Sequence, residues 1–304
     1  MRVKNVHGAP ILLIVITALL IGLNFVDISF LAIDESGYLS MIVLQILVLG
    51  LPTVFYVRFR GKKFISHLRL RFIKAYDIPL LIYAFLLMLF GGALISFVMY
   101  RFFPDAFASS SPYNISQSSG ESFGAGLYAA IAAGVVPAVT EEFLFRGVII
   151  TEYERNGVPL AVFMSSFVFA LMHLSFVRFP VYFFSGIILA LVLYATKSAV
   201  AAMTVHAASN IFAMFSEVYI YRAAVRQGGG MVMFIFICAA AFLLSAVLFC
   251  GAAQKEYTLK AYENAASEHT KRKKRGSLPY AAEALLSPAF IVLLILSVVG
   301  ILIC

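Results

Sequence analysis

Charged side chains are scarce in this sequence and are missing altogether from its longest apolar runs. Only 12% of its 304 residues are charged, whereas 62% are hydrophobic. The runs Pro10–Val26 and Met231–Ala253 hold no charge at all, and several others approach the roughly 17–25 residues that a membrane-spanning helix needs. A soluble protein of this size buries its apolar residues in short periodic segments. The composition therefore predicts an all-α fold, a polytopic transmembrane helical bundle.

Cysteine is also rare, and two common sequence signals are missing. The three cysteines, Cys238, Cys250 and Cys304, lie in or at the end of apolar segments, and none is spaced as a metal pair. This excludes a disulfide framework and a cysteine metal site. The chain shows no convincing internal repeat, which disfavours a transporter built from inverted halves. The glycines at 228–230 are not followed by the lysine of a phosphate-binding loop.

The apolar runs predict about eight transmembrane helices plus a short C-terminal apolar segment, 288–304. We expect that segment either to span a thin membrane, to be re-entrant or to lie in the interface. The first run has no convincing signal-peptide cleavage site, so we expect it to be retained as a helix. We treat residues 1–304 as a single integral membrane domain with a catalytic core at about 124–217. The expected helices are 10–32, 39–57, 78–100, 124–151, 158–177, 180–196, 199–217 and 231–254.

The net charge of +8 comes largely from basic residues that flank apolar runs. Seven lysines and arginines lie between Arg58 and Lys74, and five more form the run Lys271–Arg275. Cytoplasmic loops of membrane proteins carry such an excess. With the N-terminus cytoplasmic, eight helices place both basic stretches inside. We therefore expect a multi-pass protein of a bacterial plasma membrane, with membrane lipids rather than nucleic acid as the partners of these charges.

Two acids and an arginine interrupt the apolar run between Gly124 and Ile150. Glu142 and Arg146 are four residues apart on one helical face, in the order that favours pairing. Glu141 points about 100° away around the helix and has no basic residue three or four positions further on. Charged groups inside a membrane are costly and usually serve function. Pro137 removes a helix amide one turn earlier, so we expect the helix to kink or open beside these acids.

Two histidines and an asparagine lie in later apolar segments. His173 ends the stretch Phe169-Ala170-Leu171-Met172-His173, and His206 and Asn210 share one face of another predicted helix. Each residue alone is as well explained by a hydrogen bond between helices. Together with an unpaired glutamate, however, they supply the groups that a hydrolase needs.

These three motifs resemble those of the CPBP intramembrane proteases, the family of the type II CAAX prenyl endopeptidases and of bacteriocin-processing or immunity proteins (ABI-like). The resemblance rests on Glu141-Glu142-x-x-x-Arg146, Phe169-x-x-x-His173 and His206-x-x-x-Asn210, in this order, and covers about residues 124–217. It implies an intramembrane endopeptidase that cleaves a peptide or lipidated protein substrate near the membrane.

The resemblance also implies roles for single residues. Glu141 would activate a water molecule with help from His173, His206 and Asn210 would form the oxyanion hole, and Glu142 and Arg146 would brace the site. The family has also been described as metal-dependent, in which case Glu141, His173 and His206 would bind zinc or another divalent metal. The His-Glu-x-x-His helix of common zinc proteases is missing. We favour glutamate and water without an obligate metal.

Two other functions stay open at this point. The protein is either an enzyme or a non-enzymatic bacteriocin-immunity or membrane scaffold protein that keeps the polar cluster for packing. A carrier or proton relay would use the same acids and histidines. The sequence carries no signal for recognition of a prenyl chain, so a CAAX-type substrate follows only from the resemblance.

Overall fold

The computed structural model describes residues 8–25, 37–109, 123–225, 228–265 and 278–303. All regular secondary structure in these residues is helical, as the composition predicts. Six helical stretches are long and apolar enough to cross a membrane, and three shorter apolar helices accompany them. The chain is therefore a multi-pass integral membrane protein.

The long stretches are mostly built from consecutive helical elements. In chain order these are α1 (Gly8–Gly22) with η1 (Leu23–Phe25); α2 (Tyr38–Gln45), η3 (Ile46–Gly50) and α3 (Leu51–Arg60); η4 (Ala75–Asp77) and α5 (Ile78–Phe102); α8 (Phe123–Ala129), η5 (Ala130–Val135), α9 (Val136–Glu142), η6 (Phe143–Ile149) and α10 (Ile150–Tyr153); α12 (Phe179–Thr196); and α14 (Gly229–Ala265). The shorter apolar helices are α11 (Val158–Leu171), the first part of α13 (Ala199–Val225) and α16 (Pro288–Ile303). Short elements between them are α4 (Lys62–Ile65), α6 (Pro104–Ser109), η7 (Glu154–Asn156) and α15 (Leu278–Leu285).

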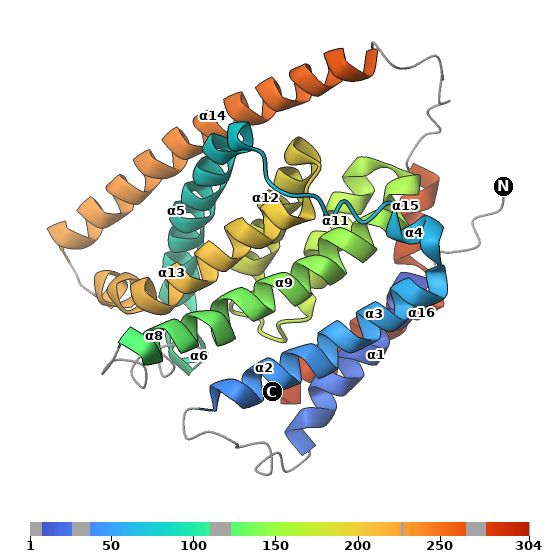
Figure 1. The fold of residues 1–304 in the computed structure, drawn as a ribbon. Coiled ribbons are helices and arrows are strands. Elements are labelled where there is room, and N and C mark those ends of the chain that lie inside the picture. The colour runs from blue at the N-terminus through green and yellow to red at the C-terminus, as the bar shows by residue number, and fades with distance from the viewer. Residues whose placement is uncertain (1–7, 26–36, 110–122, 226–227, 266–277, 304) are drawn as a thin grey trace.

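The stretch that contains α9 runs through the middle of the bundle (Figure 1). Helices α2 and α13 pack against it, α1 and α16 pack together on one side, and α5 and α14 pack together on the other. Every residue from Leu144 to Ile150 is buried, including Arg146. A helical segment that is covered all round forms the centre of a bundle. The first half of the stretch is less covered, because Leu127, Ile131, Val135 and Val139 are exposed, and the two adjacent glutamates lie just before the buried part.

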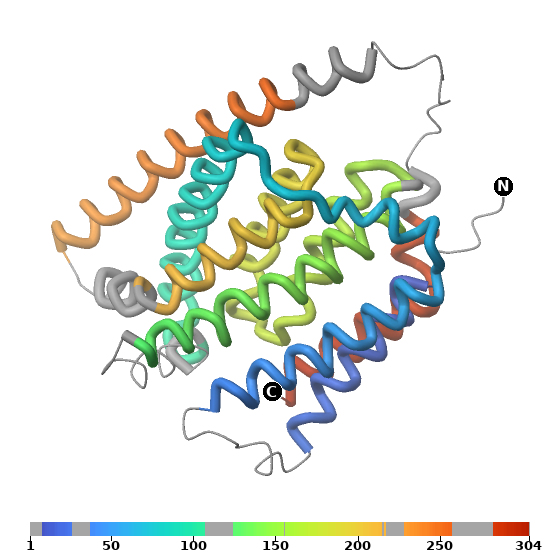
Figure 2. Tube along the Cα trace, viewed as in Figure 1, coloured from blue at the N-terminus to red at the C-terminus, as the bar shows by residue number. Residues whose placement is uncertain are grey.

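An irregular segment, residues 66–74, connects α4 to η4 and α5 and crosses one end of the bundle (Figure 2). The carbonyl of Arg69 accepts a hydrogen bond from the amide of Ala199 at 2.9 Å, where α13 begins. The Arg69 side chain also pairs with Glu154 at 2.6 Å, directly after α10. The segment therefore holds together the ends of helices that lie far apart in the sequence.

Several predicted helix boundaries are wrong. The fifth helix does not reach residue 177 but ends at Leu171, because Leu174 adopts a left-handed conformation (φ 48°) that an α-helix cannot contain. His173 therefore lies in a turn and not in a helix. The seventh and eighth helices continue beyond their predicted ends, to Val225 and Ala265. The first helical stretch is described to Phe25, and the predicted continuation to residue 32 lies outside the described residues.

The central stretch widens into π-helical turns on both sides of α9, at η5 and at η6. The first of these turns comes directly before Pro137, where the sequence predicts an opening of the helix. Single π turns occur often at functional sites, because they shift the register of the side chains that follow them. The two acids of the central helix thus lie between two irregular turns.

Candidate active site

Glu141 lies near the C-terminal end of α9 and faces two imidazole rings. Its Oε2 atom is 3.9 Å from Nε2 of His173 and 3.9 Å from Nε2 of His206. The Glu141 side chain keeps only 14% of its accessible surface, and Oε2 has no hydrogen-bond partner among the described residues. Two atoms that bind the same water at about 2.8 Å each lie roughly 4–4.6 Å apart. This spacing is close to what a shared water requires.

The ring of His173 is oriented from the backbone of its own segment. Its Nδ1 lies 2.8 Å from the carbonyl oxygen of Phe169, so Nδ1 carries a proton and donates it. In the neutral ring the lone pair then resides on Nε2, the atom that faces Glu141. Tyr182 of α12 stacks on the imidazole at 3.7 Å between ring centroids, and the Phe169 ring meets it edge-on. These contacts fix the ring although it follows the end of the helix.

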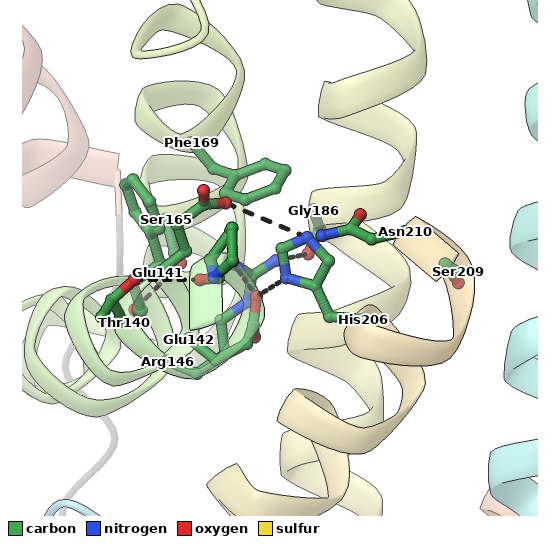
Figure 3. Close-up of polar contacts among 12 residues, drawn as sticks. Thr140, Glu141, Glu142, Arg146, Ser165, Phe169, Gly186, His206, Ser209 and Asn210 are labelled. Atoms are coloured by element: carbon green, nitrogen blue, oxygen red, sulfur yellow. Dashed lines mark hydrogen bonds and ion pairs between the residues drawn. The ribbon is translucent and has the colours of Figure 1, made fainter. Parts of the chain in front are cut away.

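His206 is oriented by the second glutamate. Its Nδ1 lies 2.9 Å from Oε1 of Glu142, which can only accept a hydrogen bond when it is ionised. The two adjacent acids of α9 therefore contact opposite nitrogens of one imidazole: Glu142 contacts Nδ1 and Glu141 faces Nε2. Figure 3 shows His206 between them, reaching from α13 toward the central helix.

Glu142 also pairs with Arg146, as the sequence predicts. Nη1 of Arg146 lies 3.0 Å from Oε1 of Glu142, and both side chains are fully buried. The guanidinium further donates from Nη2 to the carbonyl of Gly186 on α12 at 3.0 Å, and it lies over the Phe169 ring at 4.8 Å. The pair thereby connects α9, α11 and α12 around the site.

Asn210 lies one turn beyond His206 on α13. Its Nδ2 donates a long hydrogen bond of 3.5 Å to the carbonyl of Gly134 in η5. The structure thus brings Glu141, His173 and His206 directly together, while Asn210 lies at the edge of this group (Figure 3).

Three groups that shape the site are not among the residues predicted from the sequence. Gln45 of α2 donates to the Glu141 carboxylate, Tyr182 supports His173, and the carbonyl of Gly186 binds Arg146. Gln45 carries a usable signal, because it is the single amide in an otherwise apolar predicted helix. Tyr182 is one of many aromatic residues, and a backbone carbonyl has no sequence signal.

The site has the donor groups of a metal site but not the spacing. These donors are Oε2 of Glu141 and the Nε2 atoms of His173 and His206. Both histidines present a free Nε2 with Nδ1 bound to an acceptor, as metal-binding histidines do. Atoms bound to one zinc ion at about 2.1 Å lie roughly 3.0–3.4 Å from one another, which is closer than the 3.9 Å found here. In the described residues no group of three or more His, Cys, Asp or Glu side chains is arranged to hold a metal ion.

Fold and site together define a helical membrane protein with an acid and two imidazoles gathered in its interior. Residues 123–212 match the family model described as type II CAAX prenyl endopeptidase Rce1-like. This match confirms the resemblance to the CPBP intramembrane proteases and, at the level of the family, supports a protease. Comparisons with curated proteins and with solved structures gave no match.

Proposed function

We propose that this protein is an intramembrane endopeptidase that hydrolyses a peptide bond of a membrane-associated, CAAX-type substrate. The observation that carries the proposal is the Oε2 atom of Glu141, which is buried, has no hydrogen-bond partner among the described residues and faces two imidazole nitrogens at 3.9 Å. A carboxylate in this position is suited to take a proton from water. The family match supports the substrate class.

In the proposed reaction, a water molecule binds between Glu141 and His173. The lone pair on Nε2 of His173 accepts one water hydrogen, and Oε2 of Glu141 removes a proton as the water oxygen attacks the carbonyl carbon. A tetrahedral oxyanion forms. Its collapse breaks the carbon–nitrogen bond, and the proton held by Glu141 passes to the leaving amine. Atoms and charges balance without another reactant.

The oxyanion needs hydrogen-bond donors, and we assign His206 and Asn210 to this role. Each such donor is worth about 3–4 kcal/mol in soluble proteases. His206 can donate from Nε2 only when both of its ring nitrogens carry protons. Two carboxylates then flank the ring, because Glu142 accepts from Nδ1 at 2.9 Å and Glu141 lies 3.9 Å from Nε2. Asn210 has a second amide hydrogen for the oxyanion beside the one it donates to Gly134, and that long bond of 3.5 Å is also weak enough to be exchanged for the substrate.

No step of this mechanism uses a metal, and the 3.9 Å spacing of the donor atoms, which is wider than in a zinc site, supports this choice. Treatment with a strong chelator distinguishes this metal-free mechanism from a metal-dependent one. We expect the purified protein to keep its activity after the treatment. Loss of activity that zinc restores would instead assign Glu141, His173 and His206 as ligands.

The decisive experiment compares Glu141→Gln with the wild type on a farnesylated CAAX peptide in proteoliposomes. Glutamine keeps the size of the side chain but cannot act as a base, so we expect kcat to fall by about 10²–10⁴-fold. The matched control is Glu283→Gln, because Glu283 is an exposed acid of α15 outside the site. It should leave kcat unchanged.

Full activity of Glu141→Gln would refute the proposal. The second candidate is a non-enzymatic immunity or scaffold protein. It would be favoured if the phenotype that the protein gives its cell survives Glu141→Gln but is lost when the Glu142–Arg146 pair is broken. The observation that favours it is the full burial of this pair, which would stabilise the bundle without any chemistry.

A further inference from the structure

A polar side chain from outside the three motifs contacts the acid of the site. Gln45 is the last residue of α2, and its Nε2 donates to Oε1 of Glu141 at 3.1 Å and to Oγ1 of Thr140 at 3.1 Å. The contact joins residues 96 positions apart in the chain. Glu141 is thus held from α2 on one side and faces His173, in the turn after α11, and His206 of α13 on the other.

The orientation of the Gln45 amide follows from its two partners. An ionised carboxylate accepts hydrogen bonds and cannot donate, so the NH2 group and not the oxygen must face Glu141. The Thr140 hydroxyl has backbone acceptors of its own, the carbonyls of Val136 at 3.0 Å and Pro137 at 3.1 Å, so its oxygen is free to accept from Gln45. Both amide hydrogens therefore have acceptors.

The consequence lies in how the two oxygens of Glu141 are used. Oε1 is bound by Gln45, whereas Oε2 has no hydrogen-bond partner among the described residues and faces both histidines. Without the bond to Oε1, rotation of the carboxylate about its last torsion would exchange the two oxygens or turn both away. That torsion is broad for a glutamate and needs an external contact to be fixed.

We propose that Gln45 is a positioning residue for the reaction: it binds one oxygen of Glu141 and so keeps the other directed at the water and the histidines. The inference rests on the proposed function of Glu141. Gln45 also directly precedes the π turn η3, whose Gly50 lies against Thr140.

The test replaces Gln45 by leucine, which keeps much of the volume but removes both donors, and measures kcat and KM on the farnesylated peptide. We expect kcat to fall about 10–100-fold with KM within about twofold, because groups that orient a reacting residue have effects of this size. Gln45→Glu should lower kcat further than Gln45→Leu, since it keeps the shape of the amide but sets a second carboxylate against Glu141.

The control is Thr53→Val on α3. The Thr53 hydroxyl is buried and donates to the carbonyl of Leu49 at 2.6 Å, within the same membrane-spanning stretch but away from Glu141. This variant should change thermal stability in detergent about as much as Gln45→Leu does, with kcat per folded protein unchanged.

Three outcomes are distinguishable when Glu141→Gln is measured beside these variants. If Glu141→Gln is inactive and Gln45→Leu keeps kcat within twofold of the wild type, only the role of Gln45 is refuted. If Gln45→Leu loses activity only in proportion to its loss of folded protein, as a purely structural change would, the role is refuted as well. If Glu141→Gln is active, the proposed function and this inference fail together.

Discussion

Glu141 and Glu142 are adjacent in sequence but have opposite environments. Glu142 is fully buried and contacts Arg146 and His206 through Oε1, whereas the Glu141 side chain keeps 14% of its accessible surface and faces two imidazole nitrogens at 3.9 Å. The helix produces this difference, because successive side chains point about 100° apart. One acid can therefore stabilise the bundle while its neighbour takes part in the proposed reaction.

Replacement of Glu142 by glutamine is predicted to destabilise the protein. The change leaves the Arg146 guanidinium buried without its counter-charge, and breaking a buried ion pair in this way costs about 3–5 kcal/mol. Thermal unfolding in detergent, followed by circular dichroism, measures the effect. A double variant, Glu142→Gln with Arg146→Met, should be less destabilised than the sum of the single variants, since it removes the unpaired charge.

Glu154 offers the matched control for this prediction. It pairs with Arg69 at 2.6 Å, but both side chains are partly exposed. Exposed ion pairs contribute only about 0–1 kcal/mol, so Glu154→Gln should change the unfolding temperature little. If Glu142→Gln and Glu154→Gln lower the unfolding temperature equally, burial of the Glu142–Arg146 pair does not matter for stability.

At the scale of the helices, the site depends on a close crossing of α11 and α12. A side chain at Gly186 would place its Cβ 2.9 Å from Cα of Ser166, a contact with backbone that cannot move aside. The same glycine supplies the carbonyl that binds Arg146 at 3.0 Å. Only a residue without a side chain allows both the close approach and this hydrogen bond.

Gly186→Ala is therefore predicted to separate the two helices and to weaken the site. Overpacking of this kind costs about 1–3 kcal/mol, and we expect a lower unfolding temperature together with reduced kcat. Gly251→Ala is the control, because a Cβ at Gly251 of α14 meets nothing within 4 Å; in an exposed helix position, alanine should be neutral or slightly stabilising. If Gly186→Ala changes neither the unfolding temperature nor kcat, α12 can shift away from α11 without a loss of stability.

The helices themselves could be predicted from the sequence, because long apolar runs without charge have few other structures available in a membrane. The ends could not. The end of α11 at Leu171 depends on the left-handed conformation of Leu174 and on the bond from His173 to the Phe169 carbonyl, neither of which has a composition signal. The spacing of the acids predicts the pairing of Glu142 with Arg146, whereas the approach of Gln45 depends on how α2 packs against α9.

At the scale of the whole molecule, the ion pairs define one end of the bundle. Arg60 pairs with Glu152 at 2.7 Å, and the segment 66–74 is bonded to the start of α13 through the carbonyl of Arg69. The ends of α3, α10 and α12 thus lie on the same face as the basic residues between Arg58 and Lys74. If these residues are cytoplasmic, all of these helix ends are cytoplasmic too.

Labelling of single cysteines tests this orientation. Ser66 and Asp105 are exposed residues that precede and follow α5 in the chain, one directly after α4 and one in α6. In a background without the native cysteines, an impermeant maleimide should label Ser66→Cys only from the cytoplasmic side and Asp105→Cys only from the other side, because the excess of lysine and arginine keeps its end of the bundle inside.

The orientation bears directly on the proposed reaction. Glu141 lies twelve residues before Tyr153 at the end of α10, which corresponds to a depth of at most about 18 Å at the rise of an α-helix, because the wider π turn η6 lies between them. A substrate whose lipid chain lies in the inner half of the bilayer would then reach the site from the face that carries the basic residues. The opposite labelling pattern would place this face outside the cell and exclude a cytoplasmic CAAX-type substrate, whereas labelling of both positions from one side would mean that α5 does not cross the membrane.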